Sequence, residues 1–339
     1  MIYDNPIFFE KNRVYRAYKG GALLGKFVGD GSGDGNYPEE WIASSVTAEN
    51  PNPSSEKEGV SITDNGGFYL DDLIGKYPRE ILGEKRELGV LIKFLDSALR
   101  LPVQAHPDKE FSLKYFNSTH GKEESWLILA TRPGASVYFG FKDGVTREMF
   151  SKAVDQSETD AGAMERLLVK YSVKEGDVIF VPAKTVHAIG PGCLILEVQE
   201  PTDFTIQPEH MCGDIRLTEH EMYMGLDKNV CLDCFKYQST PLIKEKPITI
   251  SENGNMHREM LIGKNQTENF GINRIILKNS SFTPDVSAGV YVVLSGNGTV
   301  TAPDVKRKIN RGDYFLLPHS AVGKCVIDGN LTVAECFAQ

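Results

Sequence analysis

The sequence feature that most constrains the fold is a pattern that occurs twice: a Gly-Asp turn, a short apolar strand and a proline. The first copy, GDVIFVPAKTVH, starts at Gly176, and the second, GDYFLLPHSAVG, starts at Gly312. Two copies of one turn-strand-turn pattern predict two β units of the same kind. The first copy ends in His187 and the second in Gly323, so only the first keeps a metal-ligating side chain at this point.

The rest of the chain fits a mainly β protein with one helical interruption. Short apolar segments bounded by turn residues dominate from residue 89 onward and return after residue 270. Between them lies a stretch whose apolar residues recur at helical spacing: Met149, Phe150, Ala153 and Val154. We therefore predict three parts: a first β unit of residues 1–144 and 171–237, an insert of two helices at 145–170, and a second, metal-free β unit at 238–339.

The composition argues against two classes of partner. The formal net charge is −9 and there is no basic block, so we do not expect nucleic acid as a partner. No run of about 18 apolar residues occurs. The N-terminal residues also lack a signal-peptide pattern, so we expect a cytoplasmic protein with no membrane partner. Nothing in the sequence indicates the oligomeric state.

The six cysteines are expected to be reduced thiols in that compartment. Cys231 and Cys234 have the spacing of a zinc-binding pair, but no second pair exists. Cys212 and His220 are oddly spaced as further ligands. Ordinary helix cysteines are therefore the simpler interpretation.

Three segments of the first unit carry side chains that suit a metal. Gln104 and His106 lie two residues apart in LPVQAHP, so a strand would point both to one side. Glu124 stands at the start of a predicted strand, and His187 follows the repeated turn. One amide, two imidazoles and one carboxylate would suit Zn²⁺, or iron, manganese or cobalt. We interpret His120 as a loop histidine, and since a lone histidine is more often a surface or core residue than a ligand, the set is a hypothesis.

Several segments, in the same order along the chain, resemble type I phosphomannose isomerases, a cupin family with one zinc ion. The resemblance runs from about residue 18 to residue 206, and the C-terminal third resembles only cupins in general. The segments that carry it are KFLDSALRLPVQAHPDKEF, GKEESWLIL, PGASVYFGFKDGVTREMF, GDVIFVPAKTVHAIGPGCLILEVQEPTDFT and, more weakly, YKGGALLGKF and EEWIAS.

This resemblance implies two jelly-roll cupin units and one Zn²⁺ per chain, held by Gln104, His106, Glu124 and His187. It implies an enzyme that interconverts mannose 6-phosphate and fructose 6-phosphate through an enediol, with a small sugar phosphate as its partner. Aldose–ketose isomerisation needs polarised oxygens and a base.

The resemblance also implies roles for residues near the metal. Lys122 matches the family's lysine in G-K-x-E and is the expected acid/base or electrostatic group. Asp203 matches the aspartate of the family's S-D-x-T-x-R segment and is expected to orient groups or to shuttle a proton. Glu197 and Gln199 share one face of a strand, where they would support the ligands or act as hydrogen-bonding groups inside the barrel.

The chain departs from the family pattern at three positions. Gln207 stands where the family has the arginine that stabilises negative charge at the reacting oxygens. Pro102 replaces a residue that commonly carries a hydroxyl. Lys184 replaces a glycine, so it either adopts a positive φ at a cost of about 1 kcal/mol or faces the cavity as a phosphate-binding cation. Arg216 is a second candidate to replace the missing arginine. These departures leave two alternatives: an isomerase of another sugar, and a non-catalytic zinc-containing cupin that binds sugar.

Overall fold

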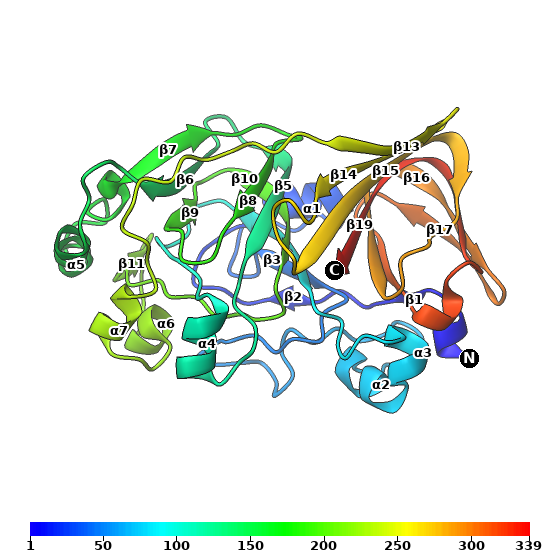
Figure 1. Ribbon diagram of the computed structural model, residues 1–339, viewed down its shortest axis with the longest axis horizontal. Helices are drawn as coiled ribbons and strands as arrows, with labels where there is room; N and C mark the ends of the chain where they lie inside the picture. The colour runs from blue at the N-terminus through cyan, green and yellow to red at the C-terminus, as the bar shows by residue number, and fades with distance from the viewer.

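The computed structural model describes residues 1–339 and shows a mainly β protein with two β units side by side along the long axis (Figure 1). The C-terminal unit, coloured yellow to red, is built from a single large sheet. Most of the short helices lie at the periphery, whereas α1 (Ala22–Val28) lies near the middle of the view, behind the strands. This is the fold class expected from the sequence. No helix combines the length and the apolar character needed to span a bilayer.

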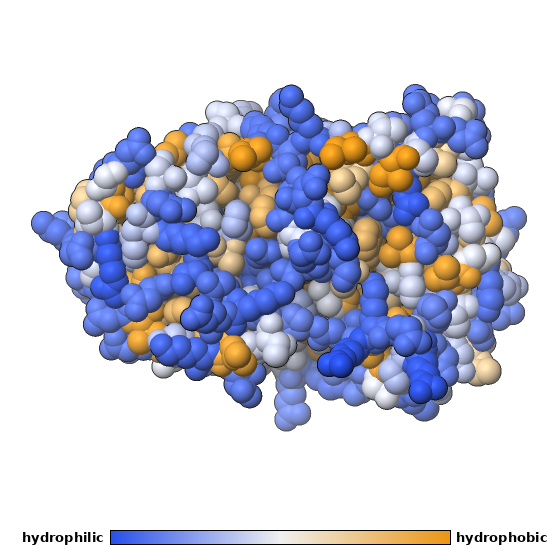
Figure 2. Space-filling view, in the orientation of Figure 1, coloured by the Kyte–Doolittle hydropathy of each residue, from blue (hydrophilic) through white to orange (hydrophobic).

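The surface seen in the same orientation is mainly hydrophilic, and hydrophobic residues appear on it in small, separate groups (Figure 2). The large hydrophobic side chains that are exposed come from distant parts of the chain, among them Leu113, Met149 and Ile243. Scattered apolar residues of this kind are normal on a protein surface and do not indicate a binding face.

The first unit contains a six-stranded and a three-stranded antiparallel sheet. In order across the first sheet, the strands are β2 (Arg13–Val14), β3 (Glu39–Ile42), β4 (Leu91–Ser97), β10 (Cys193–Gln199), β5 (Glu124–Thr131) and β8 (Val178–Val181). The second sheet consists of β7 (Leu168–Ser172), β6 (Ser136–Phe141) and β9 (His187–Ile189). The central strands β4 and β10 are buried along their whole length, so the sheet is covered on both faces.

The C-terminal unit is an eight-stranded antiparallel sheet that includes a strand from the start of the chain. Its strands are β1 (Ile7–Phe8), β18 (Tyr314–Leu317), β16 (Gly289–Ala302), β19 (Val326–Ala338), β15 (Phe270–Phe282), β14 (Met256–Ile262) and β13 (Ile248–Asn253), with β17 (Val305–Asn310) paired to β16. Because β1 pairs with β18, the first residues belong to the C-terminal sheet. The division of the chain at residue 238 otherwise stays a prediction. A short two-stranded sheet, β11 (Met211–Cys212) and β12 (Ile215–Arg216), lies apart from both.

The repeated pattern adopts the same local structure in both units. Gly176 and Gly312 have φ angles of 87° and 91°, a left-handed conformation that glycine adopts without strain. The next residue in each copy, Asp177 or Asp313, accepts a hydrogen bond from the backbone N–H three residues before it. The strand that follows is β8 in one unit and β18 in the other. The pattern that occurs twice in the sequence therefore also occurs twice in the structure.

The helices are short, and the insert is less helical than expected. The α-helices are α1 (Ala22–Val28), α2 (Leu70–Lys76), α3 (Pro78–Leu82), α4 (Lys109–Phe116), α5 (Arg147–Gln156), α6 (Glu219–Tyr223) and α7 (Lys228–Leu232), and 3₁₀ turns cover Ile2–Asp4, Glu165–Leu167 and His319–Ala321. Residues 145–170 thus contain one α-helix and one 3₁₀ turn instead of two helices. Phe150, Ala153 and Val154 are buried as the helical spacing predicted, but Met149 is exposed.

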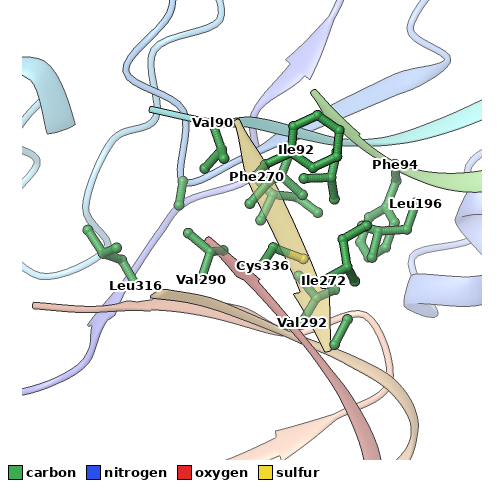
Figure 3. Close-up of a cluster of buried hydrophobic side chains, with 14 of the residues drawn as sticks. Val90, Ile92, Phe94, Leu196, Phe270, Ile272, Val290, Val292, Leu316 and Cys336 are labelled. Atoms are coloured by element: carbon green, nitrogen blue, oxygen red, sulfur yellow. The ribbon is translucent and has the colours of Figure 1, made fainter. Parts of the chain in front are cut away.

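The two units meet through a shared hydrophobic core. Figure 3 shows side chains of the first unit facing side chains of the C-terminal sheet. They are Val90, Ile92, Phe94 and Leu196 on one side, and Phe270, Ile272, Val290, Val292, Leu316 and Cys336 on the other. Since side chains alternate along a strand, Lys93 and Glu197 point to the opposite face of the first sheet. That face holds the candidate site.

Candidate metal centre and cleft

The segment that carries Gln104 and His106 is extended and is held from both sides. Gln104 exchanges two backbone hydrogen bonds of 2.9 Å with His187, so these two residues lie directly opposite each other. The next residue, Ala105, is bridged to Ile206. The segment makes these isolated bridges instead of forming the regular strand that the sequence suggested. Ala105 is buried in apolar surroundings, so its two neighbours project away from the core toward the site.

The structure brings the four predicted metal ligands together. Glu124 is the first residue of β5 and His187 the first of β9. The His106 Nε2 atom lies 3.0 Å from Glu124 Oε2, and His187 Nε2 lies 3.3 Å from Glu124 Oε1. Gln104 places its amide 3.2 Å from His187 Nε2. One ligand atom each from His106, Glu124 and His187 falls within 4.8 Å of the others, and all three residues are buried.

Backbone carbonyls fix the orientation of both imidazoles. His106 Nδ1 lies 3.0 Å from the carbonyl oxygen of Phe204, and His187 Nδ1 lies 2.9 Å from that of Thr185. A carbonyl oxygen only accepts, so in each neutral ring Nδ1 carries the proton and Nε2 keeps its lone pair. Both lone pairs are therefore directed at Glu124. This arrangement of a second-sphere acceptor behind each ring is typical of metal-bound histidine.

The protonation states leave these ligand atoms electron-rich. Burial, together with the charge of Lys122, lowers the pKa of His106 to about 3. Burial also lowers the pKa of His187. Burial opposes ionisation of Glu124, but the pKa of this carboxyl still lies well below its ordinary value because His106 and Lys122 are close. Glu124 Oε2 is a buried acceptor without a hydrogen-bond donor. Two ring nitrogens and a carboxylate that converge in this way fit a divalent cation.

Above these ligands lies a cleft that contains the other predicted site residues. Its lining includes Gln104, Lys122, Asp203, Gln207 and Pro102. Lys122 is only 4% exposed, and burial lowers its pKa. Its Nζ atom lies 3.1 Å from His106 Nε2, 3.5 Å from Glu124 Oε2 and 3.4 Å from Thr205 Oγ1. The lysine thus sits between the ligand cluster and the open part of the cleft.

Asp203 is held as an anion by two buried cations. Arg16 donates two hydrogen bonds to its carboxylate, of 3.0 and 3.2 Å, and Lys93 Nζ lies 3.3 Å away. The backbone N–H of Glu49 donates a further bond of 3.0 Å. Burial raises the pKa of Asp203, but Arg16 and Lys93 outweigh it and leave the pKa far below its usual range. Of the two roles expected for Asp203, this geometry supports orientation of its neighbours over proton transfer.

The sequence reasoning did not find Arg16 and Lys93. Both line the cleft, and both cations lie over the ring of Trp41. Arg16 Nε also lies 3.0 Å from Glu39, whose pKa is lowered to about 2 because Arg16 and Lys93 overcome the effect of burial. A signal for Lys93 was present, since a lysine inside the apolar run GVLIKFLD is rarely buried unless it is paired. No comparable signal pointed to Arg16.

Glu197 and Gln199 have different surroundings. The indole N–H of Trp126 donates to Glu124 at 3.0 Å and to Glu197 at 3.3 Å, so this ring links the ligand to the carboxyl beneath it. Burial and the charge of Glu124 raise the pKa of Glu197 to about 8. Gln199 donates to the backbone carbonyls of Glu200 and Thr202 instead. Glu197 therefore supports the ligand set, whereas Gln199 braces the chain that follows β10.

Neither residue suggested as a replacement for the missing arginine reaches the cleft. Arg216 is 57% exposed and pairs with Glu158 at 2.6 Å. Lys184 has the positive φ considered from the sequence, 65°, but its Nζ lies 3.7 Å from Asp108 and it does not line the cleft. Both suggestions are therefore wrong. Gln207 does line the cleft, and its side chain has no hydrogen-bond partner in the protein.

The remaining sequence-based interpretations concern single residues. His120 lies in a loop, 2.6 Å from Glu87, and takes no part in the ligand cluster. All six cysteines are free and buried. Cys231 lies in α7, as expected for a helix cysteine, whereas Cys234 lies in the turn after it, and both belong to an apolar cluster.

Comparisons with known proteins agree with the resemblance inferred from the sequence. No protein-family model matches the chain. The chain is 33% identical over 205 residues to mannose-6-phosphate isomerase of Streptococcus mutans, and this match covers 59% of each protein. It is 28% identical over 348 residues to mannose-6-phosphate isomerase ManA of Bacillus subtilis, with 98% of each chain covered.

Solved structures confirm the fold. The mannose 6-phosphate isomerase of Bacillus subtilis superposes with a TM-score of 0.77 at 23% identity, over 98% of this chain and 99% of the other. A mutant of the Salmonella typhimurium phosphomannose isomerase gives a TM-score of 0.74 at 14% identity, over 99% and 100% of the chains. Curated relatives and structural neighbours thus carry the same name. At these identities the superpositions establish a shared fold alone.

Proposed function

We propose that this chain, a relative of mannose-6-phosphate isomerases, is a metal-dependent aldose–ketose isomerase that interconverts mannose 6-phosphate and fructose 6-phosphate. One observation carries the proposal. Three ligand atoms, from His106, Glu124 and His187, lie within 4.8 Å of one another, next to a cleft lined by Gln104 and Lys122. Isomerisation needs polarised oxygens and a base, which a bound cation beside an acid/base group would supply, and this is the one place where the chain groups such side chains.

The ligand set suits one Zn²⁺ per chain. His106, Glu124 and His187 would hold the ion, and the amide oxygen of Gln104 would complete the set after a rotation that exchanges its oxygen and nitrogen. A bound zinc ion would act as a Lewis acid that polarises the carbonyl and hydroxyl oxygens of the sugar. Iron, manganese and cobalt accept the same donors, so the identity of the metal is a matter for measurement.

Lys122 is the proposed proton carrier. Burial disfavours its charged form, and a cation beside it would disfavour that form further. A neutral amine in this position accepts a proton from one carbon of the sugar and returns it to the neighbouring carbon through the enediol. Asp203 holds Arg16 and Lys93 against the cleft wall, and the amide of Gln207 offers a neutral donor to the reacting oxygens.

An isomerase of another, unphosphorylated sugar is the second candidate, and the charges of the cleft favour it. A phosphate requires a cation that is free to bind it. The two permanent cations of the cleft, Arg16 and Lys93, are both already paired with Asp203 and Glu39. The third possibility, a non-catalytic zinc-containing cupin, rests on Gln207 alone.

Turnover measurements on two sugars distinguish these functions. Purified, zinc-loaded protein would be incubated with mannose 6-phosphate and, separately, with mannose, and the corresponding ketose would be followed. Conversion of the phosphate ester at a kcat/KM at least about tenfold higher supports the proposal. A preference for mannose supports the second candidate. No conversion of either sugar by protein that holds one zinc per chain would exclude the proposed function and mannose as the second candidate's substrate, and would favour the binding protein. The cytoplasmic location expected from the sequence stays a prediction.

A further inference from the structure

The short turn before β5 carries Lys122 and leads into Glu124, and it packs tightly against the segment that carries His106. Lys122 lies in this turn, and Glu124 follows directly. The backbone N–H of Lys122 donates to the carbonyl of Pro107, next to His106, at 3.0 Å. A Cβ atom on Gly121 would come within 2.8 Å of the same carbonyl oxygen, so glycine is required for this approach. Small movements of the turn would therefore move Lys122 and Glu124 together.

The first unit holds the inner side of the turn through its backbone. The buried carboxylate of Glu200 accepts the N–H groups of Gly121 and Glu123 at 3.3 and 3.2 Å. The N–H of Glu200 donates back to the carbonyl of Glu123 at 3.0 Å, and the hydroxyl of Thr202 donates to the carbonyl of Gly121 at 2.8 Å. These bonds fix the backbone path but leave the Glu123 side chain free to point elsewhere.

The C-terminal unit holds the outer side of the turn through that side chain. Glu123 Oε2 accepts hydrogen bonds from Thr267 Oγ1 at 2.6 Å and from Asn269 Nδ2 at 2.9 Å. Both donors lie in the connection between β14 and β15. This connection is itself braced, because the side-chain amide of Gln339 donates to the carbonyl of Thr267 at 3.0 Å. Thr267 is only 5% exposed.

The charge of Glu123 does not explain its position. No lysine, arginine or histidine forms an ion pair with it, and the neighbouring carboxylate of Glu200 repels it. Lys109, a cation in this region, pairs with Glu200 and donates to the side chain of Asn269. A carboxylate that meets only neutral donors and another carboxylate gains its stabilisation from the two hydrogen bonds. Those bonds come from a unit that contributes no ligand to the site.

We propose that Glu123 is a positioning residue through which the C-terminal unit aims Lys122 and Glu124 at the metal. This gives the C-terminal unit a role in the reaction, and it rests on the proposed function only where turnover is concerned. Outer partners of metal ligands typically change metal affinity or activity by about 10- to 100-fold when they are removed. We expect an effect at the lower end of this range, because Glu123 acts through the backbone.

The test compares variants that remove or keep the two hydrogen bonds. Glu123→Ala removes the acceptor, and Thr267→Val removes one donor with little change in volume. Glu123→Gln keeps an acceptor oxygen without the charge, and Thr267→Ser keeps the hydroxyl. Glu268→Ala, a 78% exposed neighbour that pairs only with Lys264, controls for a change in the same connection. The measurements are zinc affinity by chelator competition, amide hydrogen exchange of residues 121–124, and kcat and KM.

Removal of the bonds should weaken zinc binding and lower kcat by about tenfold, with KM changed less than about twofold, and should speed exchange in the turn. Glu123→Gln and Thr267→Ser should restore most of each value, and Glu268→Ala should match the parent protein. Parent-like zinc affinity and exchange in Glu123→Ala would overturn the proposal, and so would a Glu123→Gln variant as impaired as Glu123→Ala. If the parent protein converts no sugar, the proposed function fails. The zinc affinity and hydrogen exchange of the variants still test the positioning role of Glu123 in that case.

Discussion

The lowered pKa of His106 predicts how the stability of the metal-free protein depends on pH. In the folded protein, burial and Lys122 lower this pKa from 6.5 to about 3. The unfolded chain binds a proton at the ordinary value, so the unfolded state holds more protons between these two limits. The contribution of His106 to the free energy of unfolding is therefore fully present above the pKa of the unfolded chain. It is lost as the pH falls toward the pKa of the folded protein.

The size of the effect follows from the same two values. Each pH unit inside the window costs about 1.4 kcal/mol of unfolding free energy for one proton. Lowering the pH from about 7 to about 5 crosses roughly 1.5 units of the window, so His106 alone should remove about 2 kcal/mol. The buried His187, whose pKa is also lowered, adds to the same trend.

Urea unfolding of the chelator-treated protein at the two pH values measures this loss. The matched variant is His106→Gln, which keeps a polar side chain of similar size but cannot titrate. The difference between the two pH values should be about 2 kcal/mol smaller in the variant than in the parent. His120→Gln, outside the ligand cluster, controls for the removal of a histidine. Equal pH differences in His106→Gln and the parent would refute the reasoning, because the ring would then be protonated as easily in the folded protein as in the unfolded chain.

Three further predictions concern the ligands and the cleft. His187→Ala should lose zinc and activity together, as elemental analysis and turnover would show, and retained zinc would contradict the ligand assignment. Arg16→Met should destabilise the protein by about 3–5 kcal/mol in urea unfolding, since it leaves the buried Asp203 short of its main cation. As the control, Arg216→Met removes an exposed ion pair and should lower the free energy of unfolding by at most about 1 kcal/mol. Gln207→Arg should raise kcat on mannose 6-phosphate by about tenfold or more, and an unchanged kcat would show that another group stabilises the developing charge.

The sequence predicted those parts of the site that depend on local pattern. Glu124 and His187 stand at strand starts, and the Gly-Asp turn before His187 could be recognised from its residues. Gln104 was expected to share a face with its neighbour two residues on, and the cross-strand bonds to His187 confirm an extended path. Local pattern also explains why the fold class was correct.

The charged wall of the cleft could not be predicted in the same way. Arg16 and Asp203 are far apart in the sequence, and their contact exists only once β2 and the chain after β10 are folded together. Two cations that looked suitable from the sequence, Lys184 and Arg216, are placed elsewhere by the same tertiary structure. Long-range pairing of charges is thus the part of the site that sequence spacing does not encode.

The two β units share a buried frame of side chains and differ at the candidate metal ligands. In the first unit Glu197 on β10 is paired in register with Trp126 and with Lys93. In the second unit Glu335 on β19 is paired in register with Tyr291 and Asn273, and it accepts hydrogen bonds from both side chains. A central buried carboxylate with an aromatic donor on one neighbouring strand is therefore common to both.

The two units share this frame but carry different residues at the positions of the candidate metal ligands. Glu124 is paired with Val181, and the corresponding pair in the second unit is Gly289 with Leu317. His187 likewise corresponds to Gly323 in the repeated turn. The central carboxylate of each unit has an internal cation beside it, Lys93 at 3.9 Å from Glu197 in the first unit and Arg258 paired with Glu335 in the second. Because one frame accommodates both arrangements, the strands and turns that the sequence encodes twice specify the β unit, whereas a few side chains at strand starts decide whether candidate metal ligands converge in it.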